Sequence, residues 1–133
     1  GTSFVKELMD NWTDGRIKLY ITWTGLQLRK QNPGLFMGSE YFPINAIGPL
    51  ADNVIAFARR YEDRWAVFAT ARFFRHLSAP NALPVGRMWN DTMLQLPEGC
   101  PVSWQNILTN EPAEGVSLES FFGTLPFGIY VGR

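Results

Sequence analysis

The tripeptide Asn32-Pro33-Gly34 divides the sequence into two parts of different character. Proline cannot continue a helix and glycine readily ends one, so this tripeptide predicts a helix stop. From Glu40 onwards the segments are short, rich in β-branched and aromatic residues, and separated by turn-forming residues. Short strands at such spacing are typical of an antiparallel sandwich or barrel. The sequence therefore predicts N-terminal helices followed by a mainly β module.

The first predicted strand covers residues 40–47, where Pro43 favours a position near the edge of a sheet. Residues 53–60 and 64–72 are expected to form a hairpin that turns at 61–63. The centres of both strands are apolar on both faces, which is expected of a sheet covered on both sides. Further strands are predicted at 84–89, 92–96, 102–109 and 127–131, a helical turn at 118–123, and loop turns at 90–91, 97–99 and 110–115.

Residues 14–30, DGRIKLYITWTGLQLRK, fit two different structures. In a strand, alternate apolar residues share one face: Ile17, Leu19, Ile21 and Trp23. In a helix, small and polar residues form one narrow stripe: Lys18, Thr22, Gly25 and Arg29. Apolar side chains would cover most of the remaining surface of that helix, which would then need neighbours on more than one side. Periodicity by itself leaves both structures open.

The first residues predict another helix. Phe4 and Leu8 recur at helical spacing, and Ser3 is suited to cap the first turn. Together with the pattern that follows, this predicts up to two helices before the β module.

Composition excludes several classes of protein. Hydrophobic residues make up 46% of the 133 residues and charged residues 18%, as in a globular domain. The 12 basic and 12 acidic residues cancel, and no basic stripe indicates nucleic-acid binding. No apolar run approaches the roughly 18 residues of a membrane span. A lone cysteine, Cys100, excludes an internal disulfide and fits a reducing compartment, so we expect a cytoplasmic protein.

Motifs for catalysis are not evident. His76 is the only histidine, which excludes a histidine-based metal site. Cys100 and His76 are formally available as nucleophile and base, but no third group is indicated and a packed or surface thiol is the simpler interpretation. No serine lies in a nucleophile elbow and no glycine pattern fits a phosphate loop. A catalytic pair of carboxylates is the remaining option, but several of the acids flank turns, where solvated positions are expected: Asp14, Asp63, Asp91, Glu98 and Glu111. The residues alone predict no catalytic group, no metal site and no cofactor.

The five tryptophans allow one binding hypothesis, because flat indole rings stack on sugar faces. Strongly apolar surroundings predict core positions for three of them: Trp12, Trp23 and Trp65. Trp89 precedes a predicted turn and Trp104 lies between Ser103 and Gln105. These last two tryptophans are therefore the candidates for binding a substrate such as a glucan.

Several segments resemble one known family, in the same order along nearly the whole chain. They are DGRIKLYITW (14–23), LQLRKQNPGLF (26–36), EYFPI (40–44), ADNVIAFARR (51–60), LPVG (83–86), NDT (90–92) and LPF (125–127). Together they resemble the end of the catalytic region of maltooligosyl trehalose synthases, enzymes of the α-amylase-like glycoside hydrolase family with a (β/α)8 barrel. The sequence departs from that pattern at Thr24-Gly25 and at Asn53, which affects local packing or polar contacts.

The resemblance implies a fold and a division of the chain. Residues 1–36 would be the last helix or two of a catalytic barrel that is otherwise missing, and residues 37–133 an antiparallel β-sandwich, the α-amylase-type C-terminal domain. On this basis residues 14–30 are expected to be a helix. One side would pack on the β-domain and the other on barrel elements outside this chain.

The resemblance also implies a function. Such enzymes isomerise the reducing-end α-1,4 linkage of a maltooligosaccharide to an α,α-1,1 trehalose linkage, using a carboxylate nucleophile and an acid/base carboxylate without a cofactor. No position here matches those carboxylates, so the chain is expected to support the barrel and to be inactive alone. Its implied partner is the upstream barrel. The alternatives are an α-glucan binding module, or a stand-alone interaction domain that dimerises through the apolar helix.

Overall fold

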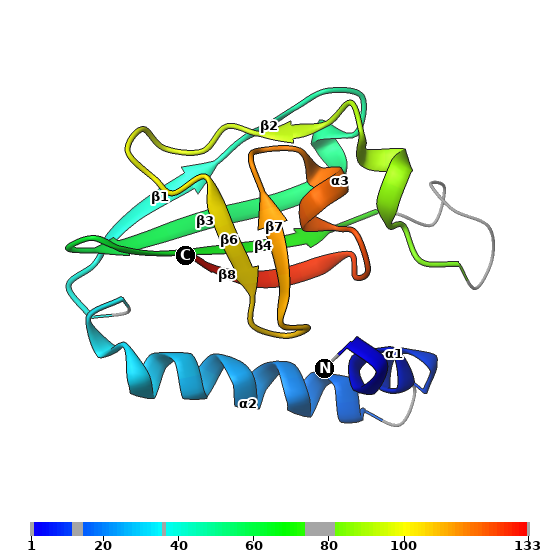
Figure 1. The fold of residues 1–133 in the computed structure, drawn as a ribbon, viewed down its shortest axis with the longest axis horizontal. Helices are drawn as coiled ribbons and strands as arrows, with labels where there is room; N and C mark the ends of the chain where they lie inside the picture. Colours follow the sequence, from blue (N-terminus) through cyan, green and yellow to red (C-terminus); the bar gives the residue numbers. More distant parts are fainter. Residues whose placement is uncertain (1, 12–14, 36, 74–81, 133) are drawn as a thin grey trace.

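The computed structural model describes residues 2–11, 15–35, 37–73 and 82–132. Two helices, α1 (Thr2–Asp10) and α2 (Arg16–Gln31), precede a β-rich domain and lie along one side of it (Figure 1). The predicted cap Ser3 lies inside α1, which begins at Thr2, two residues before the expected first helical residue Phe4. α2 ends as predicted, with the backbone N–H of Asn32 donating to the Leu28 carbonyl oxygen at 2.9 Å. The strand interpretation of residues 14–30 is therefore wrong.

Six strands form one antiparallel sheet in the order β1-β3-β4-β8-β6-β7. They are β1 (Glu40–Ile44), β3 (Val54–Tyr61), β4 (Arg64–Ala71), β6 (Ser103–Asn106), β7 (Glu111–Glu114) and β8 (Phe127–Gly132). A separate two-stranded ribbon pairs β2 (Ala46–Ile47) with β5 (Met93–Leu94). The prediction of a mainly antiparallel β-fold preceded by helices is confirmed.

The first half of the sheet follows the sequence pattern closely, except that the predicted strand 40–47 is divided between β1 and β2, which belong to different sheets. β3 and β4 form the predicted hairpin, in which Phe57 lies opposite Phe68 and their rings stack with centroids 4.7 Å apart. β1 is an edge strand, as Pro43 predicts, because an edge strand tolerates a residue that has no N–H to donate. The last strand, β8, lies over the predicted 127–131 range.

The second half differs from the prediction at four places. The predicted strand 102–109 is shorter than expected, because β6 ends at Asn106 and a turn follows. Residues 84–89 are not a strand: Gly86 has φ of +77° and opens a 3-10 helix, η5 (Gly86–Trp89). The predicted turn at 110–115 contains β7, whose Pro112 is tolerated because β7 is the other edge strand. Only two residues of the predicted strand 92–96 pair, in β5. The helical turn is α3 (Leu118–Phe121), close to its predicted place.

The main core lies on the inner face of the sheet. The sheet curls so that β6 and β7 cross in front of β3 and β4 in Figure 1. Trp104 of β6 and Val67 of β4 consequently belong to the same buried cluster, together with Trp89 of η5 and Tyr130 of β8. The largest fully buried side chains of the described residues belong to this cluster, so the β-domain holds the main core of the molecule.

The outer face of the sheet is covered only in part. α2 lies against β8 and the residues after β6, where Leu28 packs with Leu108 and Ile129. The expectation of a sheet covered on both sides is met under α2. It is wrong further along β3, where Ile55 remains 47% exposed because the helix does not reach that strand.

Candidate functional site

Helix α2 has an inner face that fixes it to the β-domain. Ile17 and Leu28 are buried, and Leu28 packs on the outer face of the sheet with Leu108 and Ile129. The hydroxyl of Tyr20 donates a hydrogen bond to the Leu108 carbonyl oxygen at 2.8 Å. These contacts join residues at least 80 positions apart, so α2 is part of the same packed body as the sheet.

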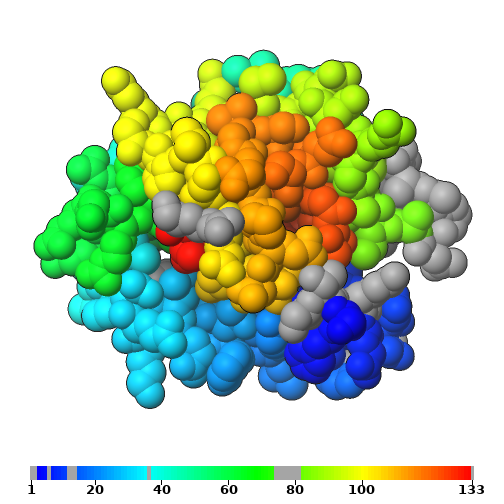
Figure 2. Space-filling view, viewed as in Figure 1, coloured from blue at the N-terminus to red at the C-terminus, as the bar shows by residue number. Residues whose placement is uncertain are grey.

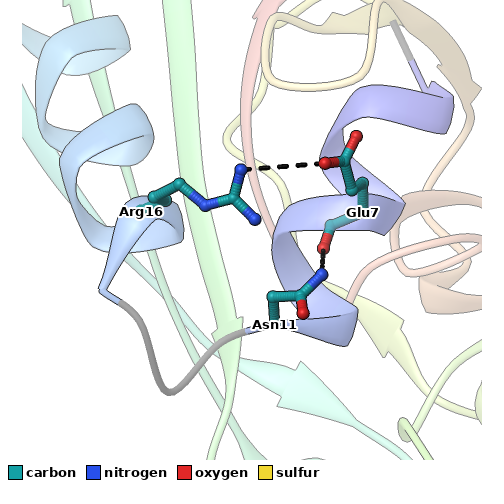
Figure 3. A network of polar contacts seen from close by, with 3 residues as sticks. All are labelled: Glu7, Asn11 and Arg16. Carbon is teal, nitrogen blue, oxygen red and sulfur yellow. Dashed lines mark hydrogen bonds and ion pairs between the residues drawn. The ribbon is translucent and has the colours of Figure 1, made fainter.

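Helix α1 is held against α2 by a small apolar cluster and one exposed polar network. Val5 and Leu8 are buried with Ile17 and with Leu125 of the loop before β8. Figure 3 shows the polar contacts: Arg16 Nη1 lies 3.7 Å from Glu7 Oε1, and Asn11 Nδ2 donates to the Glu7 carbonyl oxygen at 2.9 Å. Because both charged side chains are largely exposed, the ion pair itself adds less than about 1 kcal/mol.

The opposite face of α2 carries an exposed apolar surface, which we call the outer stripe. It consists of Leu19, Trp23 and Leu26, which are 72%, 59% and 55% exposed. Their spacing of four and three residues places them on one side of the helix. Isolated apolar side chains on a surface are ordinary, but three large ones in a row indicate a contact surface. The outer stripe is therefore the candidate functional feature of this chain.

A cavity of about 620 Å³ adjoins the outer stripe, between the second half of α2 and the β-domain. Its walls include Trp23 and Gln27 of α2, Trp65 at the start of β4, and Pro101 before β6. Figure 2 shows the segments around it: the cyan end of α2, the green turn between β3 and β4, the yellow residues before β6 and the red end of β8. The cavity thus lies where α2, the hairpin turn and the last strand meet.

One buried polar group on α2 is not satisfied. Thr24 is 7% exposed, and its hydroxyl makes no hydrogen bond to any residue that the structure describes. A buried hydroxyl without a partner costs about 1–3 kcal/mol. Thr24 belongs to the Thr24-Gly25 pair at which the sequence departs from the family pattern.

The structure confirms the predicted core position of one tryptophan and contradicts that of another. Trp65 is buried, as predicted, but Trp23 is 59% exposed, because it borders the open cavity beside α2 and belongs to none of the buried clusters. Trp12 lies outside the described residues. The two candidates for sugar binding, Trp89 and Trp104, are fully buried in the main core. Stacking on a sugar would require that core to open, and their role in binding stays an untested prediction.

The cysteine site offers no catalytic geometry in the part of the chain that is described. Cys100 is half-buried, and burial raises the pKa of its thiol above the ordinary value, with a backbone hydrogen bond acting in the opposite direction. A raised pKa leaves less of the reactive thiolate near neutral pH. His76, its formal partner, lies outside the described residues.

Other kinds of site are not evident among the described residues. No group of three or more His, Cys, Asp or Glu side chains among the described residues is arranged to hold a metal ion. Within the described ranges, no helix is both long enough and apolar enough to cross a membrane. The sequence did not single out Gln27, Gln31 or Asp63, all of which line the cavity. The four-residue spacing of the two glutamines on one helix face was the available signal.

Comparisons with known proteins give one consistent result. No family model matches the sequence. Proteins named putative maltooligosyl trehalose synthase from two strains of Mycobacterium tuberculosis are 34% identical over 115 residues, which is 86% of this chain and 13% of their own length. The chain therefore spans about an eighth of the length of these relatives.

Solved structures agree with the sequence relatives. A mutant maltooligosyltrehalose synthase from Arthrobacter ramosus matches all of this chain and 17% of its own, with a TM-score of 0.65 and 24% identity. Another structure of the Arthrobacter ramosus enzyme matches 97% of this chain and 16% of its own, with a TM-score of 0.62. These matches show that part of each enzyme shares the fold described above.

Proposed function

Because this chain belongs to the maltooligosyl trehalose synthase family, we propose that it is the C-terminal part of such an enzyme. Residues 1–36 then form the end of the catalytic barrel, and residues 37–133 the C-terminal β-domain. The chain corresponds to only 13% of its curated relatives, which leaves ample sequence for a barrel upstream. In this proposal α2 is the element shared by the two domains.

The observation that carries the proposal is the outer stripe of α2. Leu19, Trp23 and Leu26 are exposed here, although burying each would be worth about 1.5–3 kcal/mol. The inner face of the same helix is already packed on the sheet. A helix that has one apolar face buried and another exposed is expected at a junction between two domains. The upstream barrel would supply the missing neighbour.

The proposed role of the chain is structural. The β-domain would hold α2 in place through Leu28 and through the hydrogen bond from Tyr20 to the Leu108 carbonyl oxygen. The barrel would then pack against the outer face of a helix whose inner face is held by the β-domain. Losing the β-domain would leave that helix exposed on its inner face.

The proposed activity belongs to the whole enzyme and is performed in the barrel. It converts the reducing-end α-1,4 linkage of a maltooligosaccharide into an α,α-1,1 linkage, which leaves a trehalose end. Two carboxylates upstream of this chain would act as nucleophile and acid/base, with a sugar hydroxyl in place of water. We assign no catalytic residue to positions 1–133 and propose that the chain alone is inactive, in a cytoplasmic enzyme.

An immunoblot of source cells with antibody against residues 37–133 tests the proposal. A band several times the size of this chain is expected. The protein in that band should convert maltopentaose to a product without a reducing end, whereas the 133-residue chain should leave the reducing ends unchanged. A single band at the size of this chain would overturn the proposal.

The outer stripe also favours one alternative, a stand-alone interaction protein that dimerises through α2. Pairing two stripes would bury the same side chains. Sedimentation at increasing concentration would show a dimer in that case, and the variant Leu26→Lys would abolish it. A dimer of the isolated chain alone does not separate the two proposals, so the size of the immunoblot band decides between them.

A further inference from the structure

Three polar side chains border the cavity beside α2: Gln27 is half-buried, whereas Gln31 and Asp63 are exposed to solvent. Gln27 and Gln31 project from α2 one turn apart, and Asp63 comes from the turn between β3 and β4. No hydrogen bond or ion pair joins these three side chains to another residue in the described part of the chain. They therefore present two amides and one carboxylate to the same space.

The remaining charged group at this cavity is already engaged. Arg64 donates from Nη1 to Asn32 Oδ1 at 3.0 Å, and its guanidinium lies 5.8 Å from the centre of the Tyr61 ring. The cavity wall otherwise includes apolar surface from Trp65 and from Leu28. The cavity thus combines an apolar wall with unpaired donors and acceptors on its sides.

This combination selects a chemical class of ligand. Amides both donate and accept hydrogen bonds and a carboxylate accepts them, which suits hydroxyl groups. The unpaired carboxylate of Asp63 disfavours anions, and a single carboxylate with two amides provides too little charge to select a cation. Apolar walls suit the C–H faces of a sugar ring. A volume of about 620 Å³ lies within the range of small-molecule sites, about 300–1,000 Å³.

We propose that this cavity binds a neutral oligosaccharide, whose hydroxyls pair with Gln27, Gln31 and Asp63 while a ring lies against the apolar wall. The site differs from the Trp89 and Trp104 candidates, which are buried in the core. It also differs from the catalytic centre proposed in the barrel. Only the choice of an α-glucan as probe rests on the proposed function.

Titration of the ¹⁵N-labelled 133-residue chain with maltotetraose tests the proposal. Saturable chemical-shift changes are expected at the residues lining the cavity, with a Kd on the order of 1 mM. The double variant Gln27→Ala/Gln31→Ala should weaken binding by about tenfold, because two hydrogen bonds are lost. Alanine favours helix, so α2 should persist, which circular dichroism would verify. Asp63→Asn, in the hairpin turn, should weaken binding independently.

A matched control is available on the same helix. Lys18 and Thr22 are also exposed and one turn apart, but they do not line the cavity. Lys18→Ala/Thr22→Ala should therefore bind maltotetraose as the unmodified chain does. Either of two results would overturn the proposal: no saturable change in the unmodified chain, or binding that both the double glutamine variant and Asp63→Asn leave unchanged. Neither result would alter the immunoblot, so a failure of this site is distinguishable from a failure of the proposed function.

Discussion

The β-domain and the helical segment bury their large side chains to very different degrees. In the β-domain Trp89, Trp104 and Tyr130 are completely buried, from three elements that meet over one face of the sheet. In the helical segment the large side chains are divided between two faces of one helix. Leu28 is buried against the sheet while Trp23 is exposed to solvent.

This difference distinguishes the packing of the two regions. The β-domain buries its large apolar side chains against other residues of this chain, whereas α2 buries only those that face the sheet. The same 16-residue helix thus has one apolar face buried against the sheet and another exposed to solvent. Substitutions in the two regions should have correspondingly different costs.

The largest effect is expected in the core of the β-domain. Trp89→Ala removes a fully buried indole and the hydrogen bond that its Nε1 donates to the Pro84 carbonyl oxygen at 2.8 Å. The free energy of unfolding, measured by urea titration, should fall by about 3–5 kcal/mol. Trp23→Ala, the same change on the outer stripe, should alter it by less than about 0.5 kcal/mol. Equal losses would show that the two regions do not differ as described.

A second comparison uses the two faces of α2 itself. Leu28→Ala should lower the free energy of unfolding by about 2–4 kcal/mol, because Leu28 packs with Leu108 and Ile129 under the helix. Leu26→Ala, two residues earlier, should change it by less than about 0.5 kcal/mol. Both variants introduce a strong helix former, so helix propensity does not confuse the comparison. A large loss for Leu26→Ala would place that residue in a contact within this chain.

A third prediction concerns Tyr130, whose hydroxyl donates to the Phe121 carbonyl oxygen inside the core. Burial, and to a smaller extent the Glu111 carboxylate, raises the pKa of Tyr130 above its ordinary value of 10.0. Tyr130→Phe should cost about 1–2 kcal/mol at neutral pH, since a buried carbonyl loses its donor.

The pH dependence of that cost follows from the direction of the pKa shift. The unfolded chain loses the Tyr130 proton first, so the unmodified protein should lose stability above about pH 10, by up to about 1.4 kcal/mol per pH unit. Tyr130→Phe lacks this contribution, and the two stability curves should approach each other as pH rises. Curves that stay parallel above pH 10 would contradict the raised pKa.

The smallest expected effect is a gain. Thr24→Val replaces the buried hydroxyl that has no partner with a methyl group of similar size. The free energy of unfolding should rise by up to about 1 kcal/mol, because the cost of the unsatisfied hydroxyl disappears. Thr22→Val, at an exposed position two residues earlier, is the control and should change little. A loss of stability in Thr24→Val would indicate that its hydroxyl does have a partner.

The sequence predicts the first half of the sheet because local signals and packing agree there. The β3–β4 hairpin shows apolar runs on both sides of a polar turn, and Pro43 indicates an edge strand. In the second half, the local sequence signals predict elements other than those that form. Pro112 and its neighbours resemble a turn, yet β7 forms because it needs only one partner strand and buries Ala113. Gly86 begins a 3-10 helix inside residues 84–89, for which the sequence predicts a strand.

The candidate interface was only partly predictable. The helical pattern of residues 14–30 shows that α2 needs two neighbours, but it does not tell which face the sheet covers. Trp23 sits in an apolar sequence and is still exposed, because exposure depends on which side of the helix meets the β-domain. The cavity was not predictable at all, since Gln27 and Asp63 are brought together only by the packing of α2 beside the hairpin turn.

Hydroxyl-radical footprinting of tryptophan tests most directly whether an upstream barrel covers the outer stripe. In the 133-residue chain Trp23 should be oxidised rapidly, whereas Trp65, Trp89 and Trp104 should be protected. In the full-length enzyme from the source cells, oxidation of Trp23 should fall to the level of Trp65. Equally rapid oxidation of Trp23 in the full-length enzyme and in this chain would contradict the proposed interface.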